Sequence, residues 1–277
     1  MLFGTSASPG RSRLWWRLIP IVIGLAVVGY QYLGADRYTN PETGRTARLG
    51  LSTDQETALG LQGFHEVTAQ SKVISSGAAY EQVMRVSQRL ERVVAADEQL
   101  NWQVAVLDDS QQNAFCLPGG KICVYTGILL ITQSDAGLAV VLGHEMAHAT
   151  CHHGAERVLQ QNMTQTAMLG VQGSMSDLDS QQQRAVMGLI GAGAQYGVVL
   201  PFSRSHESEA DHVGLKYLVR AGYDPQEAVQ FWTRMATSTK GGGTPELMST
   251  HPLDETRIRQ IKEWIPEVVA SEHPQPQ

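Results

Sequence analysis

Residues 140–154 read VVLGHEMAHATCHHG, a segment in which two histidines four residues apart flank a glutamate within an apolar helical pattern. Side chains four residues apart lie on the same face of an α-helix, so His144 and His148 can direct their imidazoles at one point. Glu145, about 100° further round the helix, lies beside that point. The pattern predicts a helix that binds zinc, with Glu145 as the general base of a peptide hydrolase.

The residues around this motif favour a metal site over its alternative, a core helix that contains histidines by chance. Ser134 and Asp135 suit the N-cap of the helix. The apolar residues that precede His144 suit a helix buried on several sides. His152 and His153, which follow the motif, are interpreted as solvated polar residues.

The N-terminal residues predict a membrane anchor. Residues 18–34 read LIPIVIGLAVVGYQYLG, an uncharged run preceded by two tryptophans and three arginines. We expect residues 1–17 to form a basic cytoplasmic N-terminus and residues 18–34 to span a bacterial inner membrane once, which leaves the catalytic domain in the periplasm. Two alternatives stay open: a cleaved signal that releases a soluble periplasmic protein, and a mitochondrial inner-membrane location, since residues 1–35 contain no acid.

The rest of the chain is predicted to form one catalytic domain. Residues 35–53 are rich in polar and turn-forming residues without apolar periodicity, and they are predicted to form a linker. Residues 54–265 are assigned to a metallopeptidase domain of the α+β class, mainly helical, and residues 266–277 to a disordered tail. The net charge is −6 and the basic residues are dispersed, which argues against nucleic acid as a partner.

Three short segments, 102–107, 114–117 and 121–125, have strand composition and are separated by turn residues. We expect a small antiparallel sheet beside the motif helix. Its edge could hold an extended peptide substrate through backbone hydrogen bonds, and Asn113, Ala114 and Phe115 are the candidates for this contact; a purely structural hairpin is the alternative. Cys116 and Cys123 flank the turn, where buried free thiols are favoured over a disulfide.

Four blocks carry a resemblance to a known family: NAFCLPGGKICVYTG, GHEMAHATCHHGAER, LPFSRSHESEAD and STHP. Together they resemble the gluzincin peptidases that include the HtpX-like, CAAX prenyl and BepA-like proteases. The resemblance implies one Zn²⁺ per chain, with Glu207 as the third protein ligand and Asp211 as the acceptor for a ligand histidine. Glu207 and Asp211 are four residues apart, so they share the helical face that these roles require. Glu209 is the second choice for the ligand.

The resemblance also directs attention to later residues. It places His251 near the metal, either as a group that stabilises the oxyanion or as a reversible fourth ligand that blocks the metal. Arg257 is a candidate partner for the substrate or for Asp211, and His206 is interpreted as polar surface or the start of a helix rather than as a ligand. The apolar residues 185–200 are short for a second membrane span and are expected to pack behind the active site.

The function that we expect is zinc-dependent hydrolysis of peptide bonds. The resemblance implies unfolded or misassembled cell-envelope proteins as the substrates, which is protein quality control. A metal-binding chaperone or assembly factor with latent proteolysis is the alternative from another class. A CAAX-type prenyl protease is disfavoured, because that activity is associated with multi-span membrane chambers and this chain has one confident span.

Overall fold

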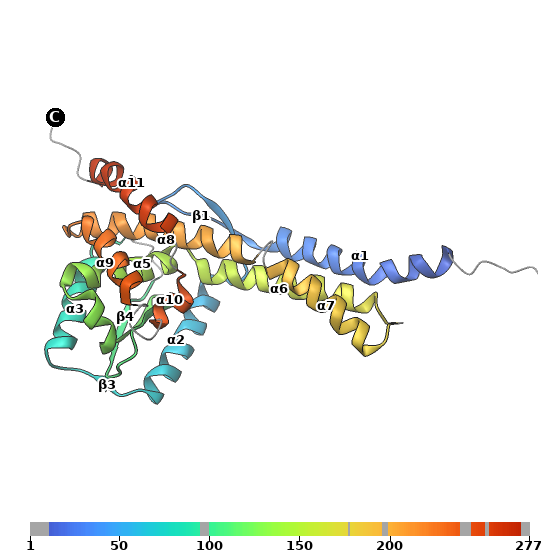
Figure 1. Ribbon diagram of the computed structural model, residues 1–277, viewed down its shortest axis with the longest axis horizontal. Helices are drawn as coiled ribbons and strands as arrows, with labels where there is room; N and C mark the ends of the chain where they lie inside the picture. Colours follow the sequence, from blue (N-terminus) through green and yellow to red (C-terminus); the bar gives the residue numbers. More distant parts are fainter. Residues whose placement is uncertain are drawn as a thin grey trace, which may run out of the picture.

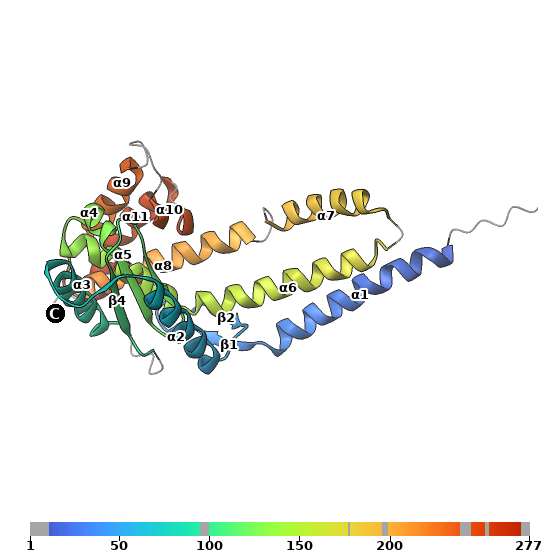
Figure 2. The ribbon, with the colours of Figure 1, turned by 90° about the horizontal axis from the view of Figure 1, so that it is seen from below.

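The computed structural model describes residues 11–94, 100–176, 178–195, 199–238, 245–252 and 255–272. The chain is mainly helical with a small sheet, which confirms the predicted class (Figure 1). Most elements form a body that surrounds one central helix. Three helices, α1 (Arg11–Gly34), α6 (His153–Gly173) and α7 (Ser180–Ala194), extend from this body as an arm (Figure 2).

The central helix is α5 (Asp135–Thr150), which carries the motif. The side chain of Ser134 accepts a hydrogen bond from the backbone of Gly137 and caps the helix as predicted. Almost every residue of α5 is buried. It packs closely on α8 (Leu200–Arg220), where a Cβ atom at Gly214 would lie 3.0 Å from the backbone nitrogen of His144. This close approach brings side chains of α8 within reach of the motif.

The other helices of the body surround α5 and the sheet. In chain order they are α2 (Thr53–Gln70), α3 (Ala78–Glu91), η1 (Thr126–Ile128), α4 (Leu129–Thr132), α9 (Gln226–Ser238), α10 (Glu246–Thr250) and α11 (Glu255–Glu272). The predicted disordered tail is wrong for residues 266–272, because α11 continues to Glu272 and buries Val268. Residues 273–277 lie outside the described part of the chain.

The main sheet has the order β3-β4-β6-β5, with β3 (Val73–Ile74), β4 (Gln103–Leu107), β5 (Ala114–Leu117) and β6 (Lys121–Tyr125). The pair β5-β6 is antiparallel, as predicted; β3, a strand that was not predicted, pairs antiparallel with β4, and β4 and β6 pair in parallel. The parallel pair arises because β6 folds back from β5 into the place beside β4. Strand β5 is therefore at an edge of the sheet, against α5.

The strand register keeps the cysteines apart. Cys116 pairs with Ile122 and Cys123 pairs with Phe115, so the two cysteines are one residue out of register. Because successive side chains point to opposite faces of a sheet, their thiols lie on different sides. All three cysteines are free, as the favoured interpretation expected.

The segment predicted to be a linker is an ordered hairpin of β1 (Asp36–Thr39) and β2 (Thr46–Leu49). Polar contacts fix it to the body: Arg45 binds Glu156 of α6 through both guanidinium Nη atoms and Glu209 of α8 through Nε. The linker interpretation of residues 35–53 is therefore wrong for this segment. Apolar periodicity cannot reveal an element that is held by ion pairs.

The N-terminal apolar run is helical, and residues Trp15–Gly34 are long and apolar enough to cross a membrane. Helix α1 lies along α6, and α7 lies on the other side of α6 (Figure 2). The expectation that residues 185–200 pack behind the active site is wrong for α7, which belongs to the arm.

Candidate metal centre and active site

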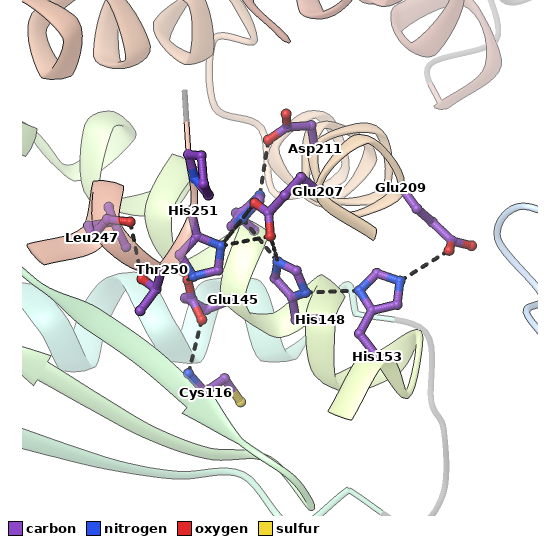
Figure 3. A network of polar contacts seen from close by, with 12 residues as sticks. Cys116, Glu145, His148, His153, Glu207, Glu209, Asp211, Leu247, Thr250 and His251 are labelled. Atoms are coloured by element: carbon purple, nitrogen blue, oxygen red, sulfur yellow. Dashed lines mark hydrogen bonds and ion pairs between the residues drawn. The ribbon is translucent and has the colours of Figure 1, made fainter. Parts of the chain in front are cut away.

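The three expected metal ligands, His144 and His148 of α5 and Glu207 of α8, meet at one point. Figure 3 shows His148 and Glu207 there. The Nε2 atoms of His144 and His148 lie 3.1 Å apart. The carboxylate of Glu207 lies 3.3 Å from Nε2 of His144 and 3.5 Å from Nε2 of His148. The i to i+4 spacing aligns the two imidazoles, and the close packing of α8 on α5 supplies the carboxylate.

His251, which follows α10, completes this group. Its Nδ1 atom lies 3.2 Å from Nε2 of His144 and 2.9 Å from Oε2 of Glu207. The four side chains each offer one ligand atom, and these atoms lie within 4.8 Å of one another. Imidazole nitrogens and a carboxylate are donors that zinc accepts, so the chemistry of the group fits this ion.

The outer nitrogen of His144, meaning the ring nitrogen Nδ1 that is not among the group of four ligand atoms, lies 3.0 Å from Oδ1 of Asp211, which holds it. Arg257 donates to both oxygens of Asp211 at 2.8 Å and stacks on the ring of Trp232. Burial by itself raises the pKa of Asp211, but Arg257 and His144 outweigh it and hold that pKa below its usual value. Of the two partners expected for Arg257, the structure shows Asp211.

The outer nitrogen of His148 has a partner that sequence reasoning missed. Nδ1 of His153 lies 2.9 Å from Nδ1 of His148, and Nε2 of His153 lies 3.1 Å from Glu209 (Figure 3). His152 turns the chain here with a left-handed φ of 53°, which starts α6 in a new direction. The signal in the sequence was a second histidine pair one turn after the motif.

Both histidines of that pair are buried, so their interpretation as solvated residues is wrong. Nδ1 of His152 lies 2.6 Å from a carboxylate oxygen of Glu56 on α2. His206 is also buried and contacts Glu156 at 2.9 Å, which corrects its assignment to polar surface. Each imidazole is paired with an acid far away in sequence, and no local pattern reports such pairs.

Glu209 lies outside the group of four. It belongs to a second group of donors with Cys151 and His153, but Nε of Arg45 lies 2.6 Å from its carboxylate. A guanidinium in this position neutralises the acid that a cation would need. The geometry therefore favours Glu207 over Glu209 as the ligand.

Glu145 lies between the edge strand and His251. Its Oε2 accepts a hydrogen bond from the backbone nitrogen of Cys116 on β5 at 3.0 Å, and its Oε1 lies 3.1 Å from Nε2 of His251. Burial lowers the pKa of His251, but Glu145 and Glu207 outweigh it and raise that pKa to about 10. The imidazole of His251 thus lies between two acids.

A pocket of about 210 Å³ opens onto Glu145, His148 and His251. Phe115 lines it as well, so one of the three residues expected to contact substrate is in place. Asn113 and Ala114 are buried instead. The backbone carbonyl of Asn113 accepts a hydrogen bond from the backbone nitrogen of Tyr125 on β6.

Comparisons with known proteins agree with this geometry. The sequence model of peptidase family M48 matches residues 78–265. The mitochondrial metalloendopeptidase OMA1 of Schizosaccharomyces pombe is 32% identical over 263 residues, which cover 94% of this chain and 74% of that protein. The beta-barrel assembly-enhancing protease of Yersinia pestis is 31% identical over 227 residues, which cover 80% of this chain and 46% of that protein. The chain thus spans about half the length of the Yersinia pestis relative.

Proposed function

This chain belongs to peptidase family M48 and is a metallopeptidase, and from that premise we propose that it is a zinc-dependent endopeptidase that acts on unfolded or misassembled proteins of the cell envelope. The observation that carries the proposal is the convergence of His144, His148 and Glu207 beside Glu145. The substrate class is inferred from relatives, among them one named a beta-barrel assembly-enhancing protease.

We assign His144, His148 and Glu207 as the ligands of one zinc ion. Zinc bound by three protein ligands acts as a Lewis acid and lowers the pKa of a water bound to it to about 7. Asp211 and His153 hold the outer nitrogens of the two histidines, so both rings keep the orientation that binding requires. Arg257 in turn fixes Asp211, and its Nη1 also lies 3.4 Å from the carboxylate of Glu207.

Glu145 is assigned as the general base. Its carboxylate faces the pocket and is oriented by the backbone nitrogen of Cys116. In this place it can take a proton from the attacking water and return it to the leaving amine. Strand β5 lies at the sheet edge beside it, so an extended peptide could pair there by backbone hydrogen bonds and present its scissile carbonyl to the site.

One contact favours a second function. Because Nε2 of His251 lies 3.1 Å from Oε1 of Glu145, this imidazole competes with water for the base while the contact holds. A chain in this state would bind misfolded partners without cleaving them, as a chaperone or assembly factor with latent proteolysis would do.

Location follows from α1. We propose that residues Trp15–Gly34 cross the membrane once, with the basic N-terminus in the cytoplasm and the body in the periplasm. A mitochondrial inner membrane is the alternative, because the Schizosaccharomyces pombe relative is named a mitochondrial enzyme.

Metal analysis and casein cleavage test these assignments together. Wild-type chain should contain one zinc per chain and cleave casein. Glu145→Gln should retain the metal and lose cleavage, since the amide cannot accept a proton. Casein binding that survives in this variant would support the chaperone function beside the peptidase. Cleavage retained in Glu145→Gln would overturn the assigned mechanism.

A further inference from the structure

Apart from the start of α6, where His153 contacts His148, the arm of α1, α6 and α7 extends away from the active site, and its three helices run side by side with α6 in the middle (Figure 2). We propose that the hairpin of α6 and α7 enters the same lipid bilayer as α1, so that lipid covers its outer faces. This inference rests on the proposed membrane span of α1. The catalytic domain itself, and not only its anchor, is then partly embedded in the bilayer.

The distribution of charge along the hairpin matches a bilayer. Residues 158–176 and residues 185–203 contain no Asp, Glu, Lys or Arg, and residues 18–35 of the α1 segment contain none either. The uncharged part of α6 within the helix, residues 158–173, is about 24 Å long, against the roughly 30 Å of hydrocarbon in a bilayer. Arg157 bounds the uncharged part of α6 at the body, and Asp179 and Arg184 lie at the far end of the hairpin.

The contact between α1 and α6 keeps these uncharged segments level with each other. A Cβ atom at Gly24 would lie 3.2 Å from the Cα of Gly170, and one at Gly173 would lie 3.0 Å from Pro20. Further along, Nε2 of Gln31 donates to Oγ1 of Thr166 at 3.2 Å. Close approach at small residues, with polar side chains bonded across the pair, is typical of helices that associate in membranes.

The outer face of α7 is apolar and uncovered, whereas α6 exposes Gln161, Gln165 and Gln172 besides Leu169. Leu169 is 60% exposed and Leu189 is 77% exposed. Among the described side chains of α7, none is buried. In water a helix of this length owes its stability to an apolar face that packs on a core, and α7 packs on α6 of the arm. Lipid would cover these side chains.

At the far end of the hairpin, side chains bond to backbone groups of the turn. Nε2 of Gln183 donates to the carbonyls of Met175 at 2.9 Å and Leu178 at 3.0 Å. The carboxylate of Asp179 accepts from the backbone nitrogens of Gln181 and Gln182, both at 2.9 Å. A turn inside or next to hydrocarbon needs such internal partners, because unpaired backbone groups there cost several kcal/mol.

The test measures the depth of single fluorophores in the full chain, reconstituted in vesicles of phosphatidylcholine and phosphatidylglycerol. An environment-sensitive dye is attached to Leu189→Cys on α7, Val22→Cys on α1 or Leu130→Cys on the body, with Cys116, Cys123 and Cys151 replaced by alanine. Leu130 is 74% exposed and is the matched control. We expect lipids with nitroxide-labelled chains to quench the dye at positions 22 and 189 to a similar extent, and not at 130.

Quenching at position 22 without quenching at position 189 would overturn the inference and leave the anchor standing. Loss of quenching at both positions would overturn the anchor and the inference together. A photo-reactive amino acid at position 189 of the chain with its native cysteines gives an independent reading. Adducts with lipid would support the inference, whereas adducts only with protein or water would contradict it.

Discussion

Nδ1 of His153 lies 2.9 Å from Nδ1 of His148, so the first residue of α6 fixes the outer nitrogen of a proposed zinc ligand. Glu209 holds His153 from its other side. Groups that orient a ligand ring typically change metal affinity 10- to 100-fold when removed. His153→Ala should therefore weaken zinc binding by about this factor, as measured by competition with a chelator. His65→Ala, on the exposed face of α2, should leave the affinity unchanged.

Glu207 and Glu209 provide a matched pair two residues apart on α8. Glu207→Gln should lose most of the zinc, because it removes one of three protein donors. Glu209→Gln should keep zinc at one per chain, since Glu209 contacts His153 and Arg45 and not the group of four. Metal content of the purified variants decides between them, and the reverse outcome would exchange the two assignments.

Asp211 is expected to act on zinc through His144. Asp211→Asn keeps the size of the side chain but removes the charge that holds Nδ1 of His144 and pairs with Arg257. Activity or zinc affinity should fall by roughly 10- to 100-fold. Circular dichroism should show an intact fold. Normal zinc content together with normal casein cleavage would rule out this role.

The acid stability of the fold should depend on Glu156. Burial opposes the ionisation of Glu156, but bonds from His206 and Arg45 outweigh it and lower its pKa from 4.5 to about 2. A depressed pKa gives stability that is present above pH 4.5 and is lost as the pH falls toward 2. Glu156→Gln should therefore be less stable than wild type at pH 7 and show a shallower loss between pH 4.5 and 2.

Urea unfolding in the presence of a chelator measures this, because metal release then makes no contribution. Glu263→Gln is the control, on an exposed position of α11. An unchanged acid profile in Glu156→Gln would show that the contacts of Glu156 with Arg45 and His206 contribute no net stability.

Much of the site could be predicted because it is local in sequence. The spacing of His144 and His148 follows from the helical repeat, and the same repeat places Glu207 and Asp211 on one face of α8. The contacts that sequence reasoning missed join distant residues. Arg45 and Glu209 are 164 positions apart, and a pattern with a period of 3.6 or 2 carries no information on such a pair.

The arm was missed for a related reason. Residues 185–200 have the composition of a buried core, and composition does not distinguish burial in protein from burial in lipid. The contact of Gly24 with Gly170 places α6 beside α1 in the fold, and it requires the antiparallel alignment of these two helices. That alignment depends on where α1 enters the body, at Gly34, and where α6 leaves it, at His153.

His251 gives the sharpest prediction, because its two proposed roles differ in sign. Nδ1 lies among the proposed ligand atoms and Nε2 lies 3.1 Å from Glu145, so the ring blocks both the metal position and the base. His251→Ala should raise basal casein cleavage, and self-cleavage should increase with it. If His251 instead stabilises the oxyanion, the same change should lower turnover by about 100-fold. Reduced turnover with zinc retained would therefore contradict inhibition, and unchanged turnover would exclude both roles.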